Sequence, residues 1–229
     1  MKEINKKIQY IHNEKVCRLQ EKNGVVYVGF PKLLAHEKNL VHGFSTRIGG
    51  VSKEHLASMN LSFTRGDNRE NVLENHRRFA KALEYDETRL VFSDQVHLTR
   101  FHKVTKKDCG KGIIRESDIK EIDGLVTNEP GIPIITFYAD CVPLFFYDPV
   151  KKVIAMAHSG WRGTVGRIGA KMTAYMEEEY GSTARDILCA VGPSICQKCY
   201  EVSEEVALQF LDVFGTAYGD ELLYEKEGG

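Results

Sequence analysis

Residues 132–163, IPIITFYADCVPLFFYDPVKKVIAMAHSGWRG, decide the fold. Three stretches rich in β-branched and aromatic residues predict strands over residues 132–138, 144–147 and 153–157. The turn-prone, charged segment 148–152 separates the last two strands and predicts a hairpin. Cys141 follows the first of these strands and His158 follows the last. We therefore expect the chain to bend near Pro143, which would bring the two side chains together.

The rest of the chain predicts further short strands and three helices. The capping-box spacing of Asp67 and Glu70 starts a helix over 68–83, a second runs from Thr164 to Gly181, and Ser203 caps a third over 203–214. Strands in runs, with helices set apart, predict an α+β fold with mixed sheets in one domain spanning residues 1–229. The other predicted strands are 25–30, 40–44, 89–92, 100–104 and 187–191.

Composition excludes several classes of partner. The chain has 31 basic and 32 acidic residues and a net charge of -1, so no electrostatic reason points to nucleic acid. No apolar run approaches the roughly 18 residues of a membrane span, and no apolar stretch follows residues 1–7 as in a secretory signal. We expect a cytoplasmic protein without a membrane partner. Its six cysteines would then be reduced, as buried fillers or ligands rather than disulfides.

Three short motifs end on or contain metal-binding side chains: DQVH at 94–97, ADCVP at 139–143 and AHSGWRG at 157–163. Two imidazoles and one thiolate, from His97, His158 and Cys141, form a plausible zinc site whose fourth position is open to water or substrate. The alternatives to metal binding are that each histidine is a neutral core residue and that Cys141 is a small buried side chain. If His102 or Cys109 supplied a fourth ligand, the zinc would be structural.

The segment 42–52, HGFSTRIGGVS, supplies hydroxyl groups, an arginine and two glycines after a predicted strand. Arg47 and the amides of Gly49 and Gly50 could hold a phosphate or carboxylate. An ordinary Gly-Gly turn with a solvated arginine is the alternative. The lone CxxC of Cys196 and Cys199 lacks the second pair of a zinc ribbon and is not embedded in a thioredoxin-like βαβ pattern, so a metal or redox role is the minority interpretation.

Taken together, these motifs resemble the bacterial laccase-domain family, formerly described as polyphenol oxidases. Its members are regarded as purine nucleoside phosphorylases and are also named peptidoglycan editing factors. The resemblance covers about residues 40–214. The matching segments are HGFSTR (42–47), GGVS (49–52), NLS (60–62), GD (66–67), DQVH (94–97), DG (123–124), ADCVP (139–143), AHSGWRG (157–163), GPSI (192–195) and CYEV (199–202).

The resemblance implies a cysteine-hydrolase-like α+β architecture, with zinc on His97, Cys141 and His158 and copper as the alternative metal. It implies phosphorolysis of adenosine, inosine and 5′-methylthioadenosine, with adenosine deamination as a second activity. The partners would be a nucleoside and phosphate, and a homo-oligomer is left open. Family members continue further at the C-terminus, so we expect residues 1–229 to lack that segment and to expose a sheet edge, with low stability.

Candidate roles follow for the remaining residues. The catalytic candidates are Cys141, Asp140 and Arg162, and the candidates for binding substrate or phosphate are Arg47, Ser45, Asn60 and Gln95. Asp140 or Gln95 would position a water molecule or the purine edge, while the metal would supply the nucleophile for deamination. Two other functions stay open: a zinc-dependent amidase acting on peptidoglycan precursors, and a non-catalytic metal-binding module.

Overall fold

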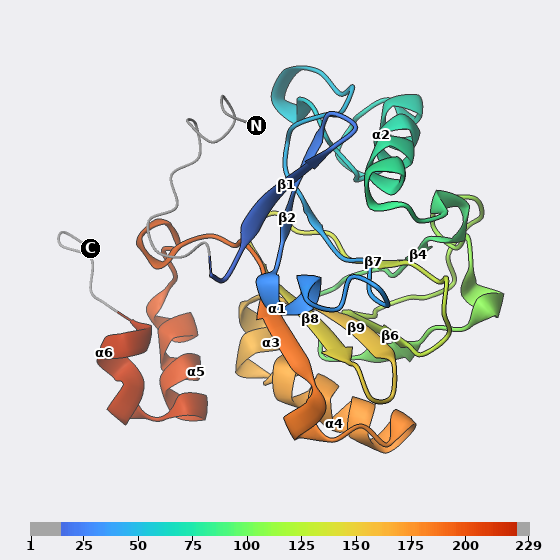
Figure 1. Ribbon diagram of the computed structural model, residues 1–229. Coiled ribbons are helices and arrows are strands. Elements are labelled where there is room, and N and C mark those ends of the chain that lie inside the picture. Colours follow the sequence, from blue (N-terminus) through green and yellow to red (C-terminus); the bar gives the residue numbers. More distant parts are fainter. Residues whose placement is uncertain (1–14, 224–229) are drawn as a thin grey trace.

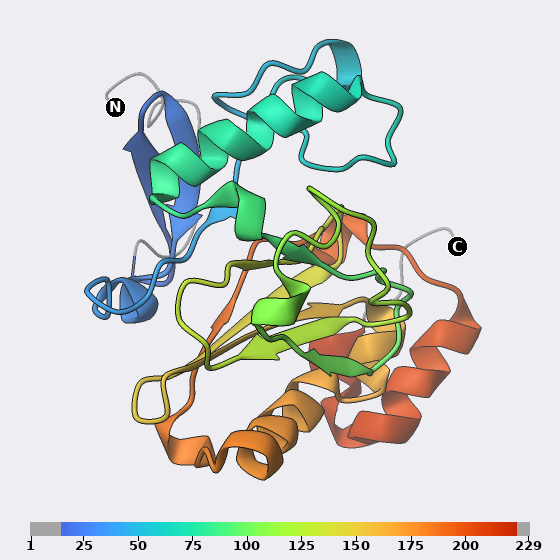
Figure 2. The same cartoon turned by 90° about the vertical axis from the view of Figure 1, so that its right-hand side faces the viewer.

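A computed structural model describes residues 15–223. Residues 1–7, which show no apolar run, and the C-terminal residues 225–229 lie outside the described part of the chain. Figure 1 shows two layers: a three-stranded sheet with α2 at the top, and a five-stranded sheet with α3 and α4 beneath it. Figure 2, turned by a quarter, shows α2 lying across the top of the molecule.

The described part of the chain contains a few helices and many short strands. The helices are α1 (Pro31–Leu34), α2 (Arg69–Leu83), α3 (Trp161–Val165), α4 (Ile168–Tyr180), α5 (Glu204–Phe214) and α6 (Gly219–Leu222). The strands are β1 (Arg18–Lys22), β2 (Val25–Gly29), β3 (Phe44–Ser45), β4 (Val91–Phe92), β5 (Phe101–Lys103), β6 (Gly124–Thr127), β7 (Ile134–Ile135), β8 (Val142–Asp148), β9 (Val153–Ser159) and β10 (Leu188–Val191).

The strands form three sheets: β1-β2-β3, β10-β8-β9-β6-β5 and the pair β4-β7. β5 runs parallel to β6, and β4 parallel to β7, whereas the other pairs are antiparallel. The predicted α+β class with mixed sheets is therefore confirmed. No helix among residues 15–223 has the length and apolar character needed to cross a membrane.

The predicted hairpin is present as β8 and β9, but the expected bend near Pro143 is wrong. Pro143 is part of β8 and pairs with His158. Cys141 stands just before the first strand of the hairpin, and His158 lies near the end of the second, so antiparallel pairing alone brings them together. The predicted strand 132–138 shortens to β7, because the Gln95 side chain binds both backbone groups of Phe137 in place of a strand.

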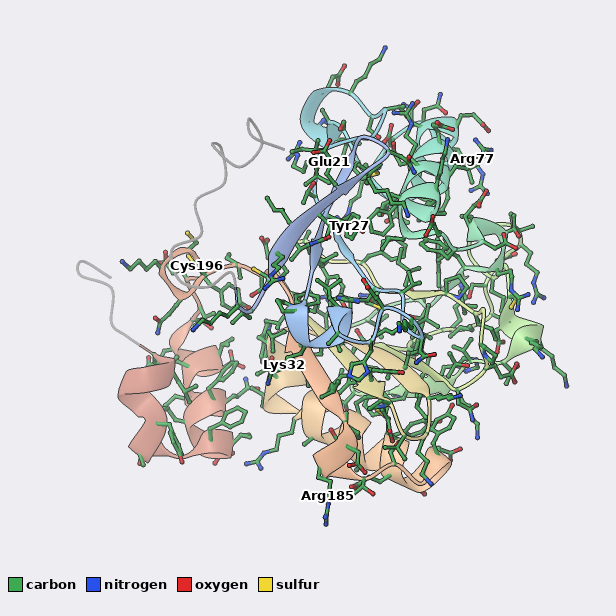
Figure 3. The ribbon with its side chains drawn as sticks, in the orientation of Figure 1. Glu21, Tyr27, Lys32, Arg77, Arg185 and Cys196 are labelled. Atoms are coloured by element: carbon green, nitrogen blue, oxygen red, sulfur yellow. The ribbon has the colours of Figure 1, made fainter. Side chains whose placement is uncertain are left out.

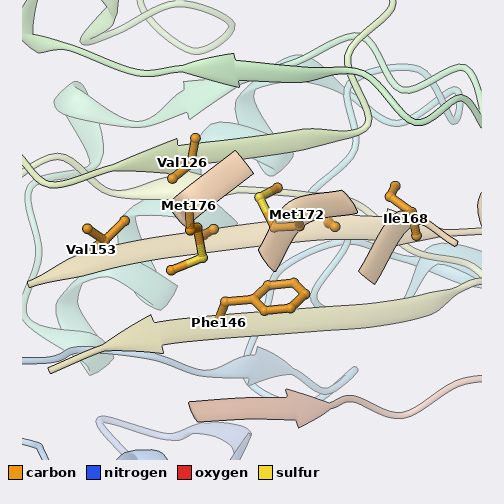
Figure 4. Packing of buried hydrophobic residues seen from close by; sticks show 8 residues of the cluster. Val126, Phe146, Val153, Ile168, Met172 and Met176 are labelled. Atoms are coloured by element: carbon orange, nitrogen blue, oxygen red, sulfur yellow. The ribbon is translucent and has the colours of Figure 1, made fainter. Parts of the chain in front are cut away.

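The main core lies between the five-stranded sheet and α4. Three residues of α4 at helical spacing, Ile168, Met172 and Met176, are fully buried against β6, β8 and β9. Figure 4 shows them beside Val126, Phe146 and Val153. Truncating a buried methionine of this kind to alanine typically costs about 2–5 kcal/mol. The helix thus fixes the sheet whose end carries the candidate ligands.

The helices differ from prediction in two places. Asn68 caps α2 by accepting a hydrogen bond from the Glu70 amide, whereas the predicted cap, Asp67, binds Ser52 and other polar groups of the preceding loop. The predicted helix from Thr164 to Gly181 is split into α3 and α4, because Arg167 has left-handed backbone geometry (φ 55°). Gly181 ends α4, and Ser203 precedes α5 without a side-chain capping bond.

Two strands were not predicted. β1, RLQEK, is polar and lies at a sheet edge, so it carries no apolar pattern. β6, GLVT, is four residues long and buried throughout, and so short a buried run shows no alternation. All six cysteines are free thiols. Cys189, Cys196 and Cys199 are exposed, so the prediction of buried fillers or ligands is wrong for these three unless they bind a metal.

Candidate metal centre

Three side chains that lie far apart in the sequence meet at one end of the five-stranded sheet. One ligand atom each of His97, Cys141 and His158 lies within 4.8 Å of the others. The two imidazole rings are 4.7 Å apart between centroids, at an angle of 71°. The predicted proximity of these three residues is confirmed.

Sheet topology explains the meeting. β9, which carries His158, lies between β8 and β6 and runs antiparallel to both. The end of β9 therefore lies beside the starts of β8 and β6, where Cys141 and Asp123 stand. β5 runs parallel to β6, and the Asp123 amide donates to the Arg100 carbonyl at 3.1 Å. This bond brings the loop of His97 to the same end of the sheet.

Asp123 organises the two histidines. Its fully buried carboxylate accepts hydrogen bonds from the amides of Val96, His97 and Leu98, at 2.8–3.2 Å. His158 Nδ1 lies 2.8 Å from Asp123 Oδ1. Burial raises the pKa of Asp123, but the bond from His158 and those from the amides outweigh it, and the pKa lies below its ordinary value. The carboxylate is therefore charged and holds His158 with Nε2 free.

Burial, together with neighbouring charges, favours the neutral forms of His97 and Cys141 in the protein alone. Burial, followed by the charges of His158 and Arg162, lowers the pKa of His97 against the opposing effect of Asp123. Burial, followed by the carboxylates of Asp140 and Asp123, raises the pKa of the Cys141 thiol. A thiol so placed is a poor free nucleophile, whereas a bound cation would favour its thiolate.

Gly160 leaves room for the cluster. A Cβ atom at this position would lie 2.7 Å from His97 Cδ2 and 3.2 Å from Cys141 Sγ. Its backbone (φ −70°, ψ 177°) is open to any residue, so packing against the ligands, not backbone conformation, demands glycine here.

The residues present fit a tetrahedral transition metal. Two neutral imidazoles and a thiolate suit zinc and also copper. A carboxylate on the far nitrogen of a ligating histidine is the usual arrangement around such metals. His102 and Cys109 are not members of the cluster, and His102 Nε2 lies 3.5 Å from Asp108. Three such ligands on a tetrahedral metal would leave one coordination position for another molecule.

The three ligands line a cavity of about 1640 Å³ between the two layers of the molecule. Arg47, Ser45, Asn60 and Gln95 line the same cavity, but Asp140 and Arg162 do not. Arg162 is exposed and stacks on Trp161, with its guanidinium carbon 4.3 Å from the ring centroid. Asp140 is exposed, with left-handed backbone geometry (φ 87°). These two predicted catalytic residues border the cluster from outside the cavity.

The predicted anion loop is only partly available. Arg47 donates through Nε to the Ala57 carbonyl and through one terminal nitrogen to the His55 carbonyl, each at 2.7 Å. The Gly50 amide, predicted to hold phosphate, donates to Ser58 Oγ instead. Close backbone packing requires both glycines, because a Cβ at Gly49 or Gly50 would lie 2.5 Å or less from a carbonyl oxygen. The Gly50 amide is therefore used within the fold, whereas a phosphate role for the Gly49 amide stays a prediction.

Asn60 and Gln95 use their polar atoms within the fold. Asn60 binds Asp67 and both backbone groups of Ser62. Gln95 joins the loop of His97 to Phe137, donating at 2.9 Å and accepting at 2.7 Å. A substrate role for either residue stays a prediction.

Sequence reasoning gave no role to Asp123 or Gly160. Asp123 stands alone beside the apolar residues of β6, and burying an isolated carboxylate is costly unless it is paired. That cost was the available signal. The sequence carries no such signal for Gly160, because only the folded chain places His97 against this residue.

Comparison with known proteins agrees with this geometry. Residues 41–227 match the family described as multi-copper polyphenol oxidoreductase laccase. Purine nucleoside phosphorylase YlmD of Bacillus subtilis (strain 168) is 42% identical over 173 residues, which are 75% of this chain and 62% of that protein. Adenosine deaminase RL5 of an unknown prokaryotic organism is 37% identical over 172 residues, 74% of this chain and 65% of that protein.

A solved structure also resembles this chain. The crystal structure of the Bacillus licheniformis hypothetical protein YfiH superposes with a TM-score of 0.82 at 32% identity, over 92% of this chain and 77% of that one. The chain spans less than two thirds of the length of the B. subtilis relative. With the match running through all three candidate ligands, this chain belongs to the multi-copper polyphenol oxidoreductase laccase family.

Proposed function

We propose that this protein is a zinc-dependent purine nucleoside phosphorylase acting on adenosine, inosine and 5′-methylthioadenosine. Relatives that carry the name purine nucleoside phosphorylase support this proposal. The single observation that carries it is one shared cavity, lined by the His97, Cys141 and His158 cluster together with Arg47.

The chain's own residues would divide the work between phosphate and base. Positive charge develops on the ribose as the N-glycosidic bond breaks, so an anion must be held on one face of the sugar. Arg47 has five N–H donors, and the carbonyls of Ala57 and His55 hold its guanidinium while other donors remain for phosphate. Ser45 lines the same cavity and offers a hydroxyl group. A bound zinc would supply Lewis acidity and lower the pKa of a water molecule.

Adenosine deamination is the second candidate, favoured by the relative named adenosine deaminase. It needs a nucleophilic water rather than phosphate, so it would use His97, Cys141 and His158 without Arg47. Asp123 would serve both reactions, because it holds His158 and the His97 loop.

Product analysis tests the two reactions together. Zinc-loaded protein is incubated with adenosine, with and without phosphate, and adenine, ribose 1-phosphate and inosine are quantified. Adenine and ribose 1-phosphate should form only with phosphate, and both should vanish in Cys141→Ser. Turnover of a peptidoglycan precursor without phosphate dependence would favour the amidase alternative. Folded, zinc-loaded protein that is inert towards adenosine and towards the precursor would refute both the phosphorylase and the amidase proposals for this chain.

The choice of metal, the location and the assembly need their own measurements. Activity after reconstitution with zinc or with copper, at matched metal occupancy, tests the proposed zinc. Cell fractionation tests the proposed cytoplasmic location, and sedimentation analysis tests for a homo-oligomer. Thermal unfolding of the 229-residue chain tests the predicted single domain.

A further inference from the structure

The loop after β10 carries two cysteines that the proposed function does not use. Cys196 immediately precedes a short 3-10 turn (Gln197–Cys199), and Cys199 is its last residue. The amides of Cys199 and Tyr200 both donate to the Cys196 carbonyl, at 3.0 and 3.1 Å. Both thiols are exposed. Figure 3 shows Cys196 on a loop at the edge of the molecule, away from the sheets.

The two thiols interact with each other. A hydrogen bond from Cys199 lowers the pKa of Cys196, and the same contact raises the pKa of Cys199. The thiolate is the nucleophile in thiol chemistry. An exposed thiol of lowered pKa beside a second thiol that can resolve it is the usual arrangement of a redox-sensing pair.

The same loop is bonded to the segment around the metal ligand Cys141. The Gly192 amide donates to the Pro143 carbonyl at 2.9 Å, and the Ile195 amide donates to the Asp140 carbonyl at 3.0 Å. These two bonds lie on either side of Cys141. Burial, followed by the proximity of Cys141, raises the pKa of Tyr200, the residue next to Cys199. A change of conformation at the cysteine pair would therefore reach the metal centre through hydrogen bonds.

We propose that Cys196 and Cys199 form a reversible dithiol–disulfide pair whose oxidation weakens metal binding at His97, Cys141 and His158. The coupling rests on the metal centre of the proposed function. Closing the disulfide tightens the turn and pulls on the Ile195–Asp140 bond, which supports the backbone next to Cys141.

The oxidant is a small-molecule disulfide. The Cys196 thiolate attacks one of its sulfurs, the S–S bond breaks, and the first small thiol leaves and takes up a proton. The Cys199 thiolate then attacks Cys196 Sγ and expels the second small thiol. Two protein thiols are oxidised, and one disulfide is reduced to two thiols.

Disulfide formation is measured first. Zinc-loaded protein, in which the metal protects Cys141, is equilibrated in buffers of oxidised and reduced glutathione and then mapped by mass spectrometry. We expect one intramolecular bridge between Cys196 and Cys199, reversed by reduced glutathione. The Cys196→Ser variant should not react at low oxidant, whereas Cys199→Ser should stop at a glutathione adduct on Cys196. Adducts without a bridge in the unmodified chain would overturn the proposal.

Zinc affinity is measured next, by competition with a chromophoric chelator. Couplings between sites start at about fivefold, so oxidised protein should bind zinc at least about fivefold more weakly than reduced protein. Coupling is reciprocal, so metal-free protein should form the bridge more readily by the same factor. The double variant Cys196→Ser/Cys199→Ser should keep the reduced affinity in either buffer. Equal affinity in both redox states would overturn the coupling alone, whereas no zinc binding in the reduced protein would overturn both the coupling and the proposed function.

Discussion

Replacing Gly160 by alanine would place a methyl carbon 2.7 Å from His97 Cδ2 and 3.2 Å from Cys141 Sγ. Ordinary carbon contacts begin near 3.4 Å, so the His97 ring must move by about 0.7 Å, the difference between 3.4 and 2.7. Metal–nitrogen distances tolerate only about 0.2 Å. We therefore expect zinc affinity to fall by at least the 10- to 100-fold typical of a disturbed ligand shell.

The stability of the metal-free protein should change little, because the exposed His97 side chain can move away from the added methyl group when no metal holds it. The backbone of Gly160 suits alanine, which stiffens the unfolded chain and stabilises by about 0.4–1 kcal/mol. Alanine is a poorer helix N-cap than glycine, by a comparable amount. The free energy of unfolding without metal should stay within about 1 kcal/mol of the parent value.

Gly163→Ala is the matched control, since its Cβ would meet its neighbours at 3.4 Å or more, none of them in the side chain of a candidate ligand. The assay is a chelator-competition titration of the parent and both variants, with urea unfolding of the metal-free forms. Gly160→Ala binding zinc as tightly as the parent, while folded, would refute the argument that His97 and Cys141 are held as ligands against Gly160.

Three further predictions concern neighbouring groups. Asp123→Asn should lower zinc affinity about 10- to 100-fold. An amide cannot accept all four hydrogen bonds that the carboxylate accepts. An affinity within threefold of the parent value would contradict the positioning role of Asp123. Arg47→Ala should lower kcat/KM for phosphorolysis by about 10- to 100-fold, which corresponds to the loss of one charged hydrogen bond. Deamination should be less affected, and Arg47→Lys should partly restore the phosphate dependence. Equal loss in both reactions would exclude a specific role of Arg47 in phosphate binding. His76 is fully buried, and burial lowers its pKa from 6.5 to about 4. The unfolded chain therefore binds more protons than the folded chain between these pH values. The contribution of His76 to the free energy of unfolding is complete above pH 6.5 and is lost on acidification towards pH 4, by about 2 kcal/mol at pH 5. Urea unfolding of metal-free protein at pH 7 and pH 5 measures the total loss, and His76→Gln should remove only the share of His76. His42, whose pKa burial also lowers from 6.5 to about 4, should keep its own share in that variant.

The hairpin and the helices could be predicted because their signals are local. Apolar strands around a charged turn gave β8 and β9, and helical spacing gave the buried face of α4. The bend proposed at Pro143 was wrong because it placed Cys141 at the end of a preceding strand. The register of one hairpin already brings Cys141 and His158 together.

The cluster itself could be predicted from residue type, but its supports could not. Asp123 acts through amides of another loop, and Gly160 acts by leaving space, so neither role has a signature in spacing alone. Gln95 lines the cavity but also binds the backbone of Phe137, a contact that its sequence position does not reveal, and its substrate role stays a prediction. A polar side chain beside an apolar strand can satisfy the backbone as readily as a ligand can.

The pairing of Pro143 with His158 also has a consequence for the order in which the protein assembles. Cys141 and His158 belong to one hairpin with a short turn, so their approach needs only local chain closure, which is fast. His97 arrives later, when the distant strands β5 and β6 have paired beside β9. Zinc present during refolding would thus meet two ligands before the third, and by favouring the paired hairpin it should quicken the acquisition of the native sheet.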